Sequence, residues 1–551
     1  MPNATALGAC DGPLVTTHRG ADDLLSAGLG LAGLRATQPP SVADASAPTV
    51  DELRRRAIWT NWRGIADLGP GAHGESYGSL DPVPGREARA LLKLPGARQP
   101  HRVLLQLPDR FDTTKPCVLV TASSGSRGVY GAIALAGGWG LPRGCAVIYT
   151  DKGAGTDWLA APDRVAHQLD GRLGGEGAVA FELEQAPSGV AFKHAHSGDH
   201  PEAHWGEHVV QAARWGLAQI DALIADEAQF DASRVRMIAV GVSNGAGAVL
   251  QAAGLDAVDW DAVVAVSPNV WAGEGGRALL DYALEAALWM PCALQHPGFN
   301  HTPFARPGVG GMVRCASLHA AGMLAAADPA AQPDEALQHL HDSGWTDEAL
   351  QSAAISQGLD LWRAVAAGYA SAYLRAGPDA MPCGYRYDVL DAEGHARPAS
   401  ASERALWWSD ASGIPPGSGV ALLNPAEPVD ALDPAWPGLV CLRDLASGAD
   451  ASSHALRAAM QATRARRPPA DLPVYLLHGL ADGLVPIDFS SRPYAAWVQA
   501  APNRLQVEWI ERAQHFDALV ALPLLEGRYQ ALMPHAYAAL DRAWAESKHD
   551  D

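Results

Sequence analysis

The chain has 551 residues, of which 48% are hydrophobic and 19% are charged. This composition excludes a long disordered chain and supplies enough apolar side chains for a large core. The formal net charge is −20, and a negative field of this size repels phosphate backbones and anionic lipids. We therefore expect neither a nucleic-acid partner nor a membrane partner.

The compartment is predicted from the N-terminal segment and the cysteines. Residues 1–30 show neither the basic stretch nor the apolar stretch of a secretion signal. The seven cysteines lie far apart, and Cys117 and Cys145 fall inside apolar runs, where we interpret them as small core residues. A reducing, cytoplasmic location is favoured, although a mature extracellular protein whose leader has been removed would look the same.

Short β-branched runs alternate with longer helical stretches from residue 101 onward. Near-continuous apolar strands bounded by helices are typical of a parallel sheet covered on both faces. The predicted helices between the strands are 205–227 and 245–253. The fold class is therefore α/β. The predicted strands are 101–107, 117–121, 145–150, 235–240, 262–266, 474–477 and 505–510.

Residues 271–470 differ in character, because helical stretches dominate and strand-like runs are rare. We therefore predict an α/β core made of residues 1–270 and 471–551, interrupted by a large, mainly helical insertion at 271–470. An insertion at the carboxyl end of a strand lies over the place where α/β sheets bind ligands, so we interpret it as a lid. Its predicted features are helices at 277–288, 347–375 and 453–466 and a passage rich in proline and glycine at 413–438.

A G-x-S-x-G pentapeptide occupies residues 241–245, with Ser243 at its centre. An apolar strand runs into it and a small-residue helix runs out, which is the strand–turn–helix context of a nucleophilic serine in α/β-hydrolase folds. The flanking glycines are needed because a Cβ would clash in so sharp a turn. The alternative is an ordinary glycine-rich turn with a capping serine. We predict Ser243 as a nucleophile in an α/β-hydrolase fold with a mostly parallel sheet.

A nucleophilic serine needs a general base, and the base needs an acid that orients it. In α/β-hydrolases the order along the chain is serine, acid, histidine. Asp482 follows one late strand and His515 follows the next, so both belong to loops at the carboxyl ends of strands. We predict Asp482 as the acid and His515 as the base. Asp517 is a rival acid, and His478 is expected to be structural.

The oxyanion of such a reaction needs two backbone N–H donors. Asn244, directly after the nucleophile, is expected to supply one. The loop at 121–128 is expected to supply the other, with Ser123 and Ser124 as candidates; a plain turn is the alternative. Arg127 in the same loop is a candidate for binding a substrate carboxylate, and a solvated loop arginine is its alternative.

Two other features are prominent. The segment 194–208 contains five histidines, and His204 and His208 have a metal-ligand spacing. The motif H-E-x-x-H is absent, so we expect no metal and interpret the segment as a loop at the mouth of the site or as a solvated polar stretch. In the insertion, Trp407 and Trp408 are the aromatic pair that we predict to contact substrate, against the alternative that they are core residues. The five histidines are His194, His196, His200, His204 and His208.

Several stretches of the chain together resemble the D-(−)-3-hydroxybutyrate oligomer hydrolase family. They are DDLLSAGLG at 22–30, TASSGSRGVYGA at 121–132, TDKGAGT at 150–156 and the serine box at 241–245. The resemblance implies hydrolysis of short, soluble (R)-3-hydroxybutyrate oligomers to monomer, with Ser243 as the charge-relay nucleophile. Its partners would be small ester molecules, and we expect no cofactor. The oligomeric state stays open.

Other functions fit parts of the pattern. Another short-polyester hydrolase stays open. Tannase and feruloyl-esterase types place cysteines beside the serine and the histidine, where this chain has Val242 and Gln514. A peptidase of the prolyl-oligopeptidase type would need an upstream propeller that the N-terminal segment is too short to form. A non-catalytic binding scaffold would lack a member of the serine–histidine–acid set, whereas all three residues are present. We therefore predict a serine esterase that works through an acyl-enzyme.

Overall fold

The computed structural model describes residues 8–224, 234–305, 309–410, 419–424 and 432–546. Its main feature is a nine-stranded sheet with the strand order β1-β2-β3-β5-β4-β8-β9-β13-β14. The neighbours from β5 to β14 pair in parallel, whereas β1, β2 and β3 join the sheet by antiparallel pairings. The strands are β1 (Leu14–His18), β2 (Gly85–Leu92), β3 (His101–Pro108), β4 (Cys117–Ala122), β5 (Ala146–Thr150), β8 (Arg236–Val242), β9 (Ala262–Val266), β13 (Pro473–Gly479) and β14 (Arg504–Ile510).

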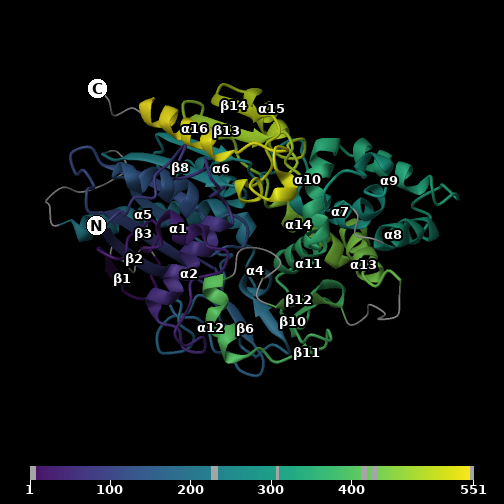
Figure 1. The fold of residues 1–551 in the computed structure, drawn as a ribbon, viewed down its shortest axis with the longest axis horizontal. Helices are drawn as coiled ribbons and strands as arrows, with labels where there is room; N and C mark the ends of the chain where they lie inside the picture. The colour runs from purple at the N-terminus through teal and green to yellow at the C-terminus, as the bar shows by residue number, and fades with distance from the viewer. Residues whose placement is uncertain (1–7, 225–233, 306–308, 411–418, 425–431, 547–551) are drawn as a thin grey trace.

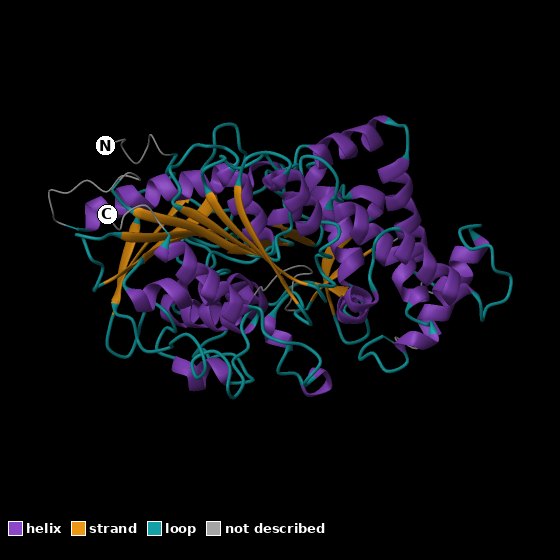
Figure 2. Cartoon of the chain, turned by 90° about the horizontal axis from the view of Figure 1, so that it is seen from above, coloured by secondary structure: helices purple, strands orange, loops and turns teal. Residues whose placement is uncertain are grey.

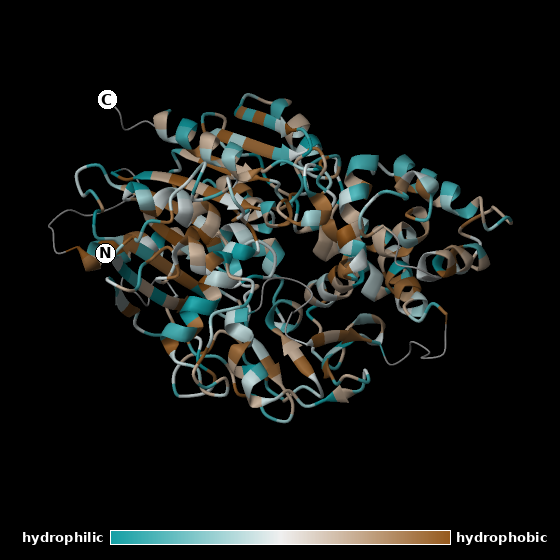
Figure 3. Cartoon of the chain, viewed as in Figure 1, coloured by the Kyte–Doolittle hydropathy of each residue, from teal (hydrophilic) through white to brown (hydrophobic). Residues whose placement is uncertain are grey.

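Helices cover both faces of this sheet (Figure 2). On β4, Val118 and Val120 pack in a core with α5 and α6, and Leu119 packs in a second core with α2 and α16. Because both faces are buried there, the central strands β4, β5, β8 and β9 are nearly continuous apolar runs, and several strands are brown in Figure 3. The helices around the sheet are α1 (Gly30–Arg35), α2 (Val50–Arg63), α3 (Gly138–Gly140), α5 (Trp205–Leu223), α6 (Asn244–Ala253), α15 (Ser491–Gln499) and α16 (Met533–Ala545).

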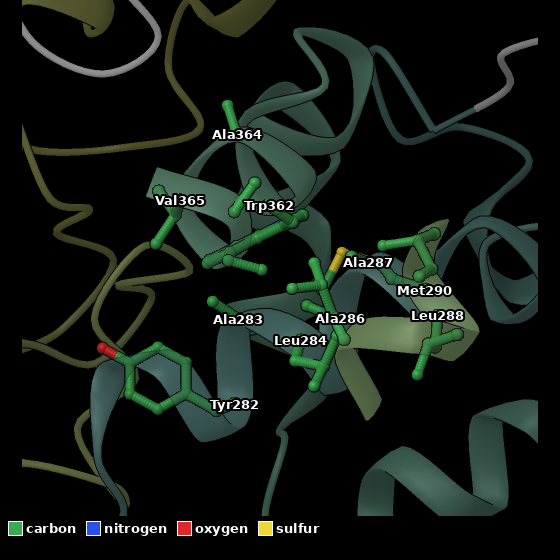
Figure 4. Packing of buried hydrophobic residues seen from close by; sticks show 14 of the residues in the cluster. Tyr282, Ala283, Leu284, Ala286, Ala287, Leu288, Met290, Trp362, Ala364 and Val365 are labelled. Atoms are coloured by element: carbon green, nitrogen blue, oxygen red, sulfur yellow. The ribbon is translucent and has the colours of Figure 1, made fainter. Parts of the chain in front are cut away.

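The chain between β9 and β13 is mainly helical and lies beside the sheet (Figure 1). Its own apolar core forms between α7 and α11, where Trp362 faces Ala283 and Ala286 (Figure 4). Among the described residues, no helix combines the length and the apolar character needed to cross a membrane. The helices of this segment are α7 (Leu279–Ala293), α8 (Val309–Ala320), α9 (Gln332–Asp342), α10 (Asp347–Gly358), α11 (Leu361–Tyr373), α12 (Ala401–Asp410), α13 (Trp436–Ser447) and α14 (Ala451–Gln461).

A second, smaller sheet differs from the predicted organisation. Its strand order is β11-β10-β7-β6, and β12 pairs with β10. Since β6 and β7 precede the nucleophile in sequence, the inserted segment builds this sheet together with residues 158–192. The predicted boundary at residue 271 leaves these strands out. The elements are β6 (Trp158–Ala160), β7 (Val190–Phe192) with the short α4 (Lys193–His196), β10 (Arg386–Leu390), β11 (Ala396–Arg397) and β12 (Val420–Leu423).

The predicted elements of the core agree closely with the structure. All seven predicted strands are present, with bounds displaced by two residues at most. The predicted helix 347–375 is divided into α10 and α11, because Asp360 between them has a φ of +53°. The predicted helix 205–227 is α5 and ends at Leu223; residues 225–227, like much of the passage at 413–438, lie outside the described residues.

Disulfide bonds change the interpretation of the cysteines. Cys117 and Cys145 are buried, as predicted for core residues, but they are bonded to each other because β4 and β5 are neighbours. Cys292–Cys315 and Cys383–Cys441 form two further disulfides, and Cys10 is free and exposed. Disulfides persist in oxidising compartments and are rare in the cytosol. The compartment of this protein stays a prediction.

This pairing gives a direct prediction for thiol chemistry. We expect alkylation of the unfolded, unreduced protein to label Cys10 alone, and alkylation after reduction to label all seven cysteines. Reduction should also lower the melting temperature, because a disulfide typically stabilises a protein by about 3 kcal/mol. Mass spectrometry of the alkylated peptides measures the pairing. Labelling of Cys117 or Cys145 without a reductant would contradict it.

Candidate active site

Ser243 lies at the sharp turn between β8 and α6. Its backbone has φ +59° and ψ −127°, a strained conformation typical of a nucleophile elbow. A Cβ on Gly241 would come within 2.4 Å of the backbone of Gly245, and a Cβ on Gly245 would come within 2.2 Å of the Ala122 carbonyl oxygen. Both glycines of the G-x-S-x-G pattern are therefore required, because any side chain at either position would clash with the backbone. The serine at the carboxyl edge of a mostly parallel sheet makes this an α/β-hydrolase fold.

The structure brings Ser243, His515 and Asp482, here called the relay, into one chain of hydrogen bonds. His515 Nε2 lies 2.8 Å from Ser243 Oγ, and His515 Nδ1 lies 2.7 Å from Asp482 Oδ2. All three residues are buried. With Nδ1–H donating to the carboxylate, Nε2 is free to accept the serine hydroxyl proton. This is the geometry in which a histidine can act as general base toward a serine.

Asp482 is fixed by the loop that follows β13. Its Oδ1 accepts hydrogen bonds from the backbone N–H groups of Leu484 and Val485, at 2.9 and 2.8 Å. Its Oδ2 also lies 3.1 Å from His478 Nε2. Burial by itself raises the pKa of the Asp482 carboxyl, but the His515 and His478 rings together lower that pKa well below its ordinary value. Asp482 therefore stays ionised at neutral pH.

The neighbouring polar residues have structural contacts. His478 donates from Nε2 to the Val485 carbonyl, at 2.8 Å, and accepts at Nδ1 from the Ser491 hydroxyl, at 2.7 Å. These bonds fix the loop that carries Asp482, which is the structural role predicted for His478. Asp517, the rival acid, instead accepts the backbone N–H groups at the start of α16. Burial raises the pKa of Asp517 to about 7.

Two backbone segments beside Ser243 are available for an oxyanion. Asn244 is the first residue of α6, so its N–H has no acceptor within the helix and lies at the positive end of the helix dipole. Ser123 is excluded as the second donor, because its N–H already donates to the Thr150 carbonyl at 2.9 Å. Ser124 stays a candidate. Gly125, which the sequence analysis missed, lines the cavity with Ser243; the glycine between two serines was its only indication.

The buried Lys152 is hydrogen-bonded to the loop at 121–128. Lys152 Nζ donates to Ser123 Oγ at 2.9 Å and to the Gly125 carbonyl at 2.6 Å. Burial lowers the pKa of Lys152 to about 7, although the nearby Asp151 and Glu202 carboxylates oppose this shift. Lys152 belongs to the family-like stretch at 150–156, but no role was predicted for it.

The histidine-rich segment supports the same loop. His194 Nδ1 lies 2.7 Å from Ser126 Oγ, and His194 Nε2 is hydrogen-bonded to Glu202, so the three side chains form a buried chain under the loop. Within the described residues, no group of three or more potential ligands is arranged to hold a metal ion. The solvated-stretch interpretation is wrong for most of the segment, whose buried members are His194, His196, His200 and His208.

Replacing Lys152 by methionine tests how Lys152 contributes to stability, because that contribution should depend on pH. Burial holds the pKa of Lys152 at about 7 instead of 10.5, so between these values the unfolded chain carries a proton that the folded chain lacks. Stability contributed by this group therefore rises with pH across that window and is constant below it. We expect the melting temperature of the wild type to rise relative to that of Lys152→Met as the pH increases from about 7 to 10.5. A constant difference in scanning fluorimetry would contradict this.

A cavity of about 140 Å³ lies in front of Ser243. It is small beside the roughly 300–1,000 Å³ of sites for drug-sized ligands. The helical insertion supplies one wall, since Leu279 belongs to α7, and Leu361, Val365 and Tyr369 belong to α11. The cavity thus suits a short, partly apolar molecule. The other lining residues are Gly125, Arg127, Asn244, Leu484, Val485 and Phe516.

The two predicted aromatic contacts do not line this cavity. Trp407 is buried on α12 with its ring 5.8 Å from that of Trp158, and Trp408 is buried in the core that contains α2. Their assignment as substrate-binding residues is wrong. The apolar face of α12 packs against α2 and β6, so these rings are structural.

The chain is similar to known proteins over nearly its whole length. A model of the 3HB-oligomer hydrolase family matches residues 9–551. The D-(−)-3-hydroxybutyrate oligomer hydrolase of Paracidovorax citrulli is 35% identical, over 95% of this chain and 85% of that protein. The enzyme of the same name from Cupriavidus metallidurans is 34% identical, over 95% and 82%.

Solved structures with some likeness include esterases and lipases. The rice cell wall degrading esterase LipA from Xanthomonas oryzae is 13% identical with a TM-score of 0.34, covering 85% of this chain and 92% of that one. An open-form lipase is 13% identical with a TM-score of 0.31, covering 81% and 95%. The family match and the relatives that align with 95% of this chain are decisive: this chain belongs to the 3HB-oligomer hydrolase family and is a carboxylic ester hydrolase.

Proposed function

We propose that this enzyme hydrolyses short (R)-3-hydroxybutyrate oligomers, such as the dimer and trimer, through an acyl-enzyme on Ser243. The observation that carries the proposal is the hydrogen-bonded set of Ser243, His515 and Asp482 at the end of a small cavity. The substrate class comes from the names of the relatives, each a D-(−)-3-hydroxybutyrate oligomer hydrolase.

In this mechanism, Ser243 Oγ attacks the ester carbonyl while His515 Nε2 takes the hydroxyl proton. The backbone N–H of Asn244 and an N–H from Ser124 or Gly125 stabilise the oxyanion. His515 then gives its proton to the leaving alkoxide, and a hydroxybutyryl ester remains on Ser243. Water, activated by His515, attacks this ester and frees the acid.

The surroundings of the relay favour this function over the aromatic-ester alternative. Val242 and Gln514 stand beside the serine and the histidine, where tannase and feruloyl-esterase types have cysteines. The apolar wall made by Leu361 and Val365 suits the methyl groups of a hydroxybutyrate chain. A hydrolase of another short polyester is the second candidate, because the same wall would accept it.

The test is acid release from (R)-3-hydroxybutyrate trimer by the purified enzyme, beside cleavage of p-nitrophenyl butyrate. We expect both esters to be cleaved. Cleavage of p-nitrophenyl butyrate alone would leave the esterase in place and overturn the substrate class, and other short polyesters would be assayed next. Cleavage of neither would overturn the catalytic assignment and favour a binding scaffold.

A further inference from the structure

Arg127 is a buried cation in the wall of the cavity, and the described part of the chain gives it no anionic partner. It is 6% exposed, and no described carboxylate forms an ion pair with it. Its Nη2 donates to the Gly64 carbonyl at 3.0 Å, and its Nη1 is buried without a hydrogen-bond partner among the residues that the structure describes. Two other buried arginines are paired with acids, Arg102 with Asp157 and Arg314 with Asp433.

The fold makes room for this guanidinium. A Cβ at Gly64 would come within 2.1 Å of Arg127 Nη1, so a larger residue at position 64 would displace the side chain. Gly64 has a φ of −80°, which any residue adopts, so the glycine is needed for space. A buried charge without a partner is costly. An anionic ligand in the cavity would supply the missing partner.

Arg127 and the base His515 are both close to the ring of Phe516. The Phe516 ring lies 4.3 Å from the His515 ring, and Arg127 Cζ lies 5.6 Å from the centre of the same Phe516 ring. His515 must protonate the leaving oxygen, so the leaving unit occupies the histidine side of Ser243. Because Phe516 contacts the base and also lies beside Arg127, Arg127 is the cavity-lining cation near the histidine side of Ser243.

We propose that Arg127 binds the free carboxylate of the leaving unit, so that the enzyme cuts the ester bond nearest the carboxyl end of an oligomer. The inference rests on the proposed function. In the terminal hydroxybutyrate unit, one methylene group separates the alkoxide-bearing carbon from the carboxylate, so one small unit carries both the oxygen that His515 protonates and a carboxylate for Arg127. The acyl–oxygen bond breaks, the alkoxide takes a proton from His515, and the remaining chain stays esterified to Ser243. Water then releases that chain with a new terminal carboxylate, which is again a substrate.

The test compares the trimer with its methyl ester and with p-nitrophenyl butyrate, for the wild type and for Arg127→Gln. We expect the wild type to prefer the free acid. Arg127→Gln should lower kcat/KM for the free acid by about 10–100-fold, mainly through KM, because a hydrogen-bonded ion pair is lost. The methyl ester and p-nitrophenyl butyrate should change by less than about threefold, which also shows that the variant folds.

Two further variants sharpen this test. Arg127→Lys keeps the charge without the bidentate fork, so we expect an intermediate loss on the free acid. Arg467→Gln is the matched control, because Arg467 also donates to a backbone carbonyl and lies over an aromatic ring, both belonging to Trp497, but outside the cavity. We expect Arg467→Gln to leave kcat/KM unchanged for all three substrates.

A trimer labelled with ¹³C in its carboxyl-terminal unit tests the direction of cleavage. We expect the first monomer released to carry the label. Label retained in the first dimer, or equal losses on the free acid and the methyl ester in Arg127→Gln, would overturn the inference and leave the proposed function standing. Failure of the wild type to cleave any trimer would overturn the proposed function itself.

Discussion

Replacing Ser243 by alanine is expected to lower kcat for p-nitrophenyl butyrate and for the trimer by about 10⁴–10⁶-fold. The hydroxyl oxygen is the atom that attacks the ester, and it lies 2.8 Å from the base that would take its proton. Alanine fits the same strained backbone and leaves the cavity wall unchanged, so KM and the melting temperature should change little. Initial rates at saturating substrate measure the effect.

Ser371→Ala is a suitable control for this result. Ser371 is also buried, and its hydroxyl donates to the Ala195 carbonyl at 2.9 Å, but it is not part of the cavity lining. We expect its kcat to stay within about threefold of the wild type, because a single neutral hydrogen bond is lost. If Ser243→Ala kept more than about a tenth of the activity, Ser243 would not be the nucleophile.

The relay could be predicted from the sequence because each member follows a local pattern. Ser243 is set between an apolar strand and a small-residue helix, and Asp482 and His515 each follow a late strand. The carboxyl ends of parallel strands meet at one edge of the sheet, so order along the chain is enough to bring the three together.

The second oxyanion donor could not be predicted in the same way. Which N–H remains free depends on long-range pairing: the Ser123 N–H is taken by Thr150, at the end of a neighbouring strand. Likewise, the apolar character of Trp407 and Trp408 does not distinguish a ligand contact from a core contact. Only the docking of α12 against the distant α2 and β6 decides that both rings are structural, with Trp408 in the core beside α2 and Trp407 beside Trp158 of β6.

In the antiparallel part of the sheet, β3 was predicted but β1 and β2 were not, and β2 was missed because its sequence is unusually charged. β2 contains Glu87, which is fully buried and accepts hydrogen bonds from Arg54 at 2.8 Å and from Arg89 at 2.6 Å. These charges compensate one another inside the protein, so burial does not require an apolar run. Such a strand becomes visible only when its partners are known, and the same is true of disulfide partners such as Cys383 and Cys441.

Replacing Asp482 by asparagine should cost about 10⁴-fold in kcat. The asparagine carbonyl can still accept the N–H groups of Leu484 and Val485, so the loop should keep its shape. Its amide group, however, would donate to His515 Nδ1 and place the ring proton on Nε2. That tautomer cannot accept the proton of Ser243. The expected signature is a large loss of kcat with little change in KM or melting temperature.

Asp517→Asn is the matched variant that distinguishes the two acids. Asp517 is also buried, accepts two backbone N–H groups and lies two residues after the base, but it makes no contact with the His515 ring nitrogens, one bonded to Ser243 and the other to Asp482. We expect Asp517→Asn to stay within about tenfold of the wild type, because it affects only the packing of α16. A larger loss in Asp517→Asn than in Asp482→Asn would reverse the assignment. The geometry requires the opposite order, since the acid that holds the correct tautomer must touch Nδ1 of the base.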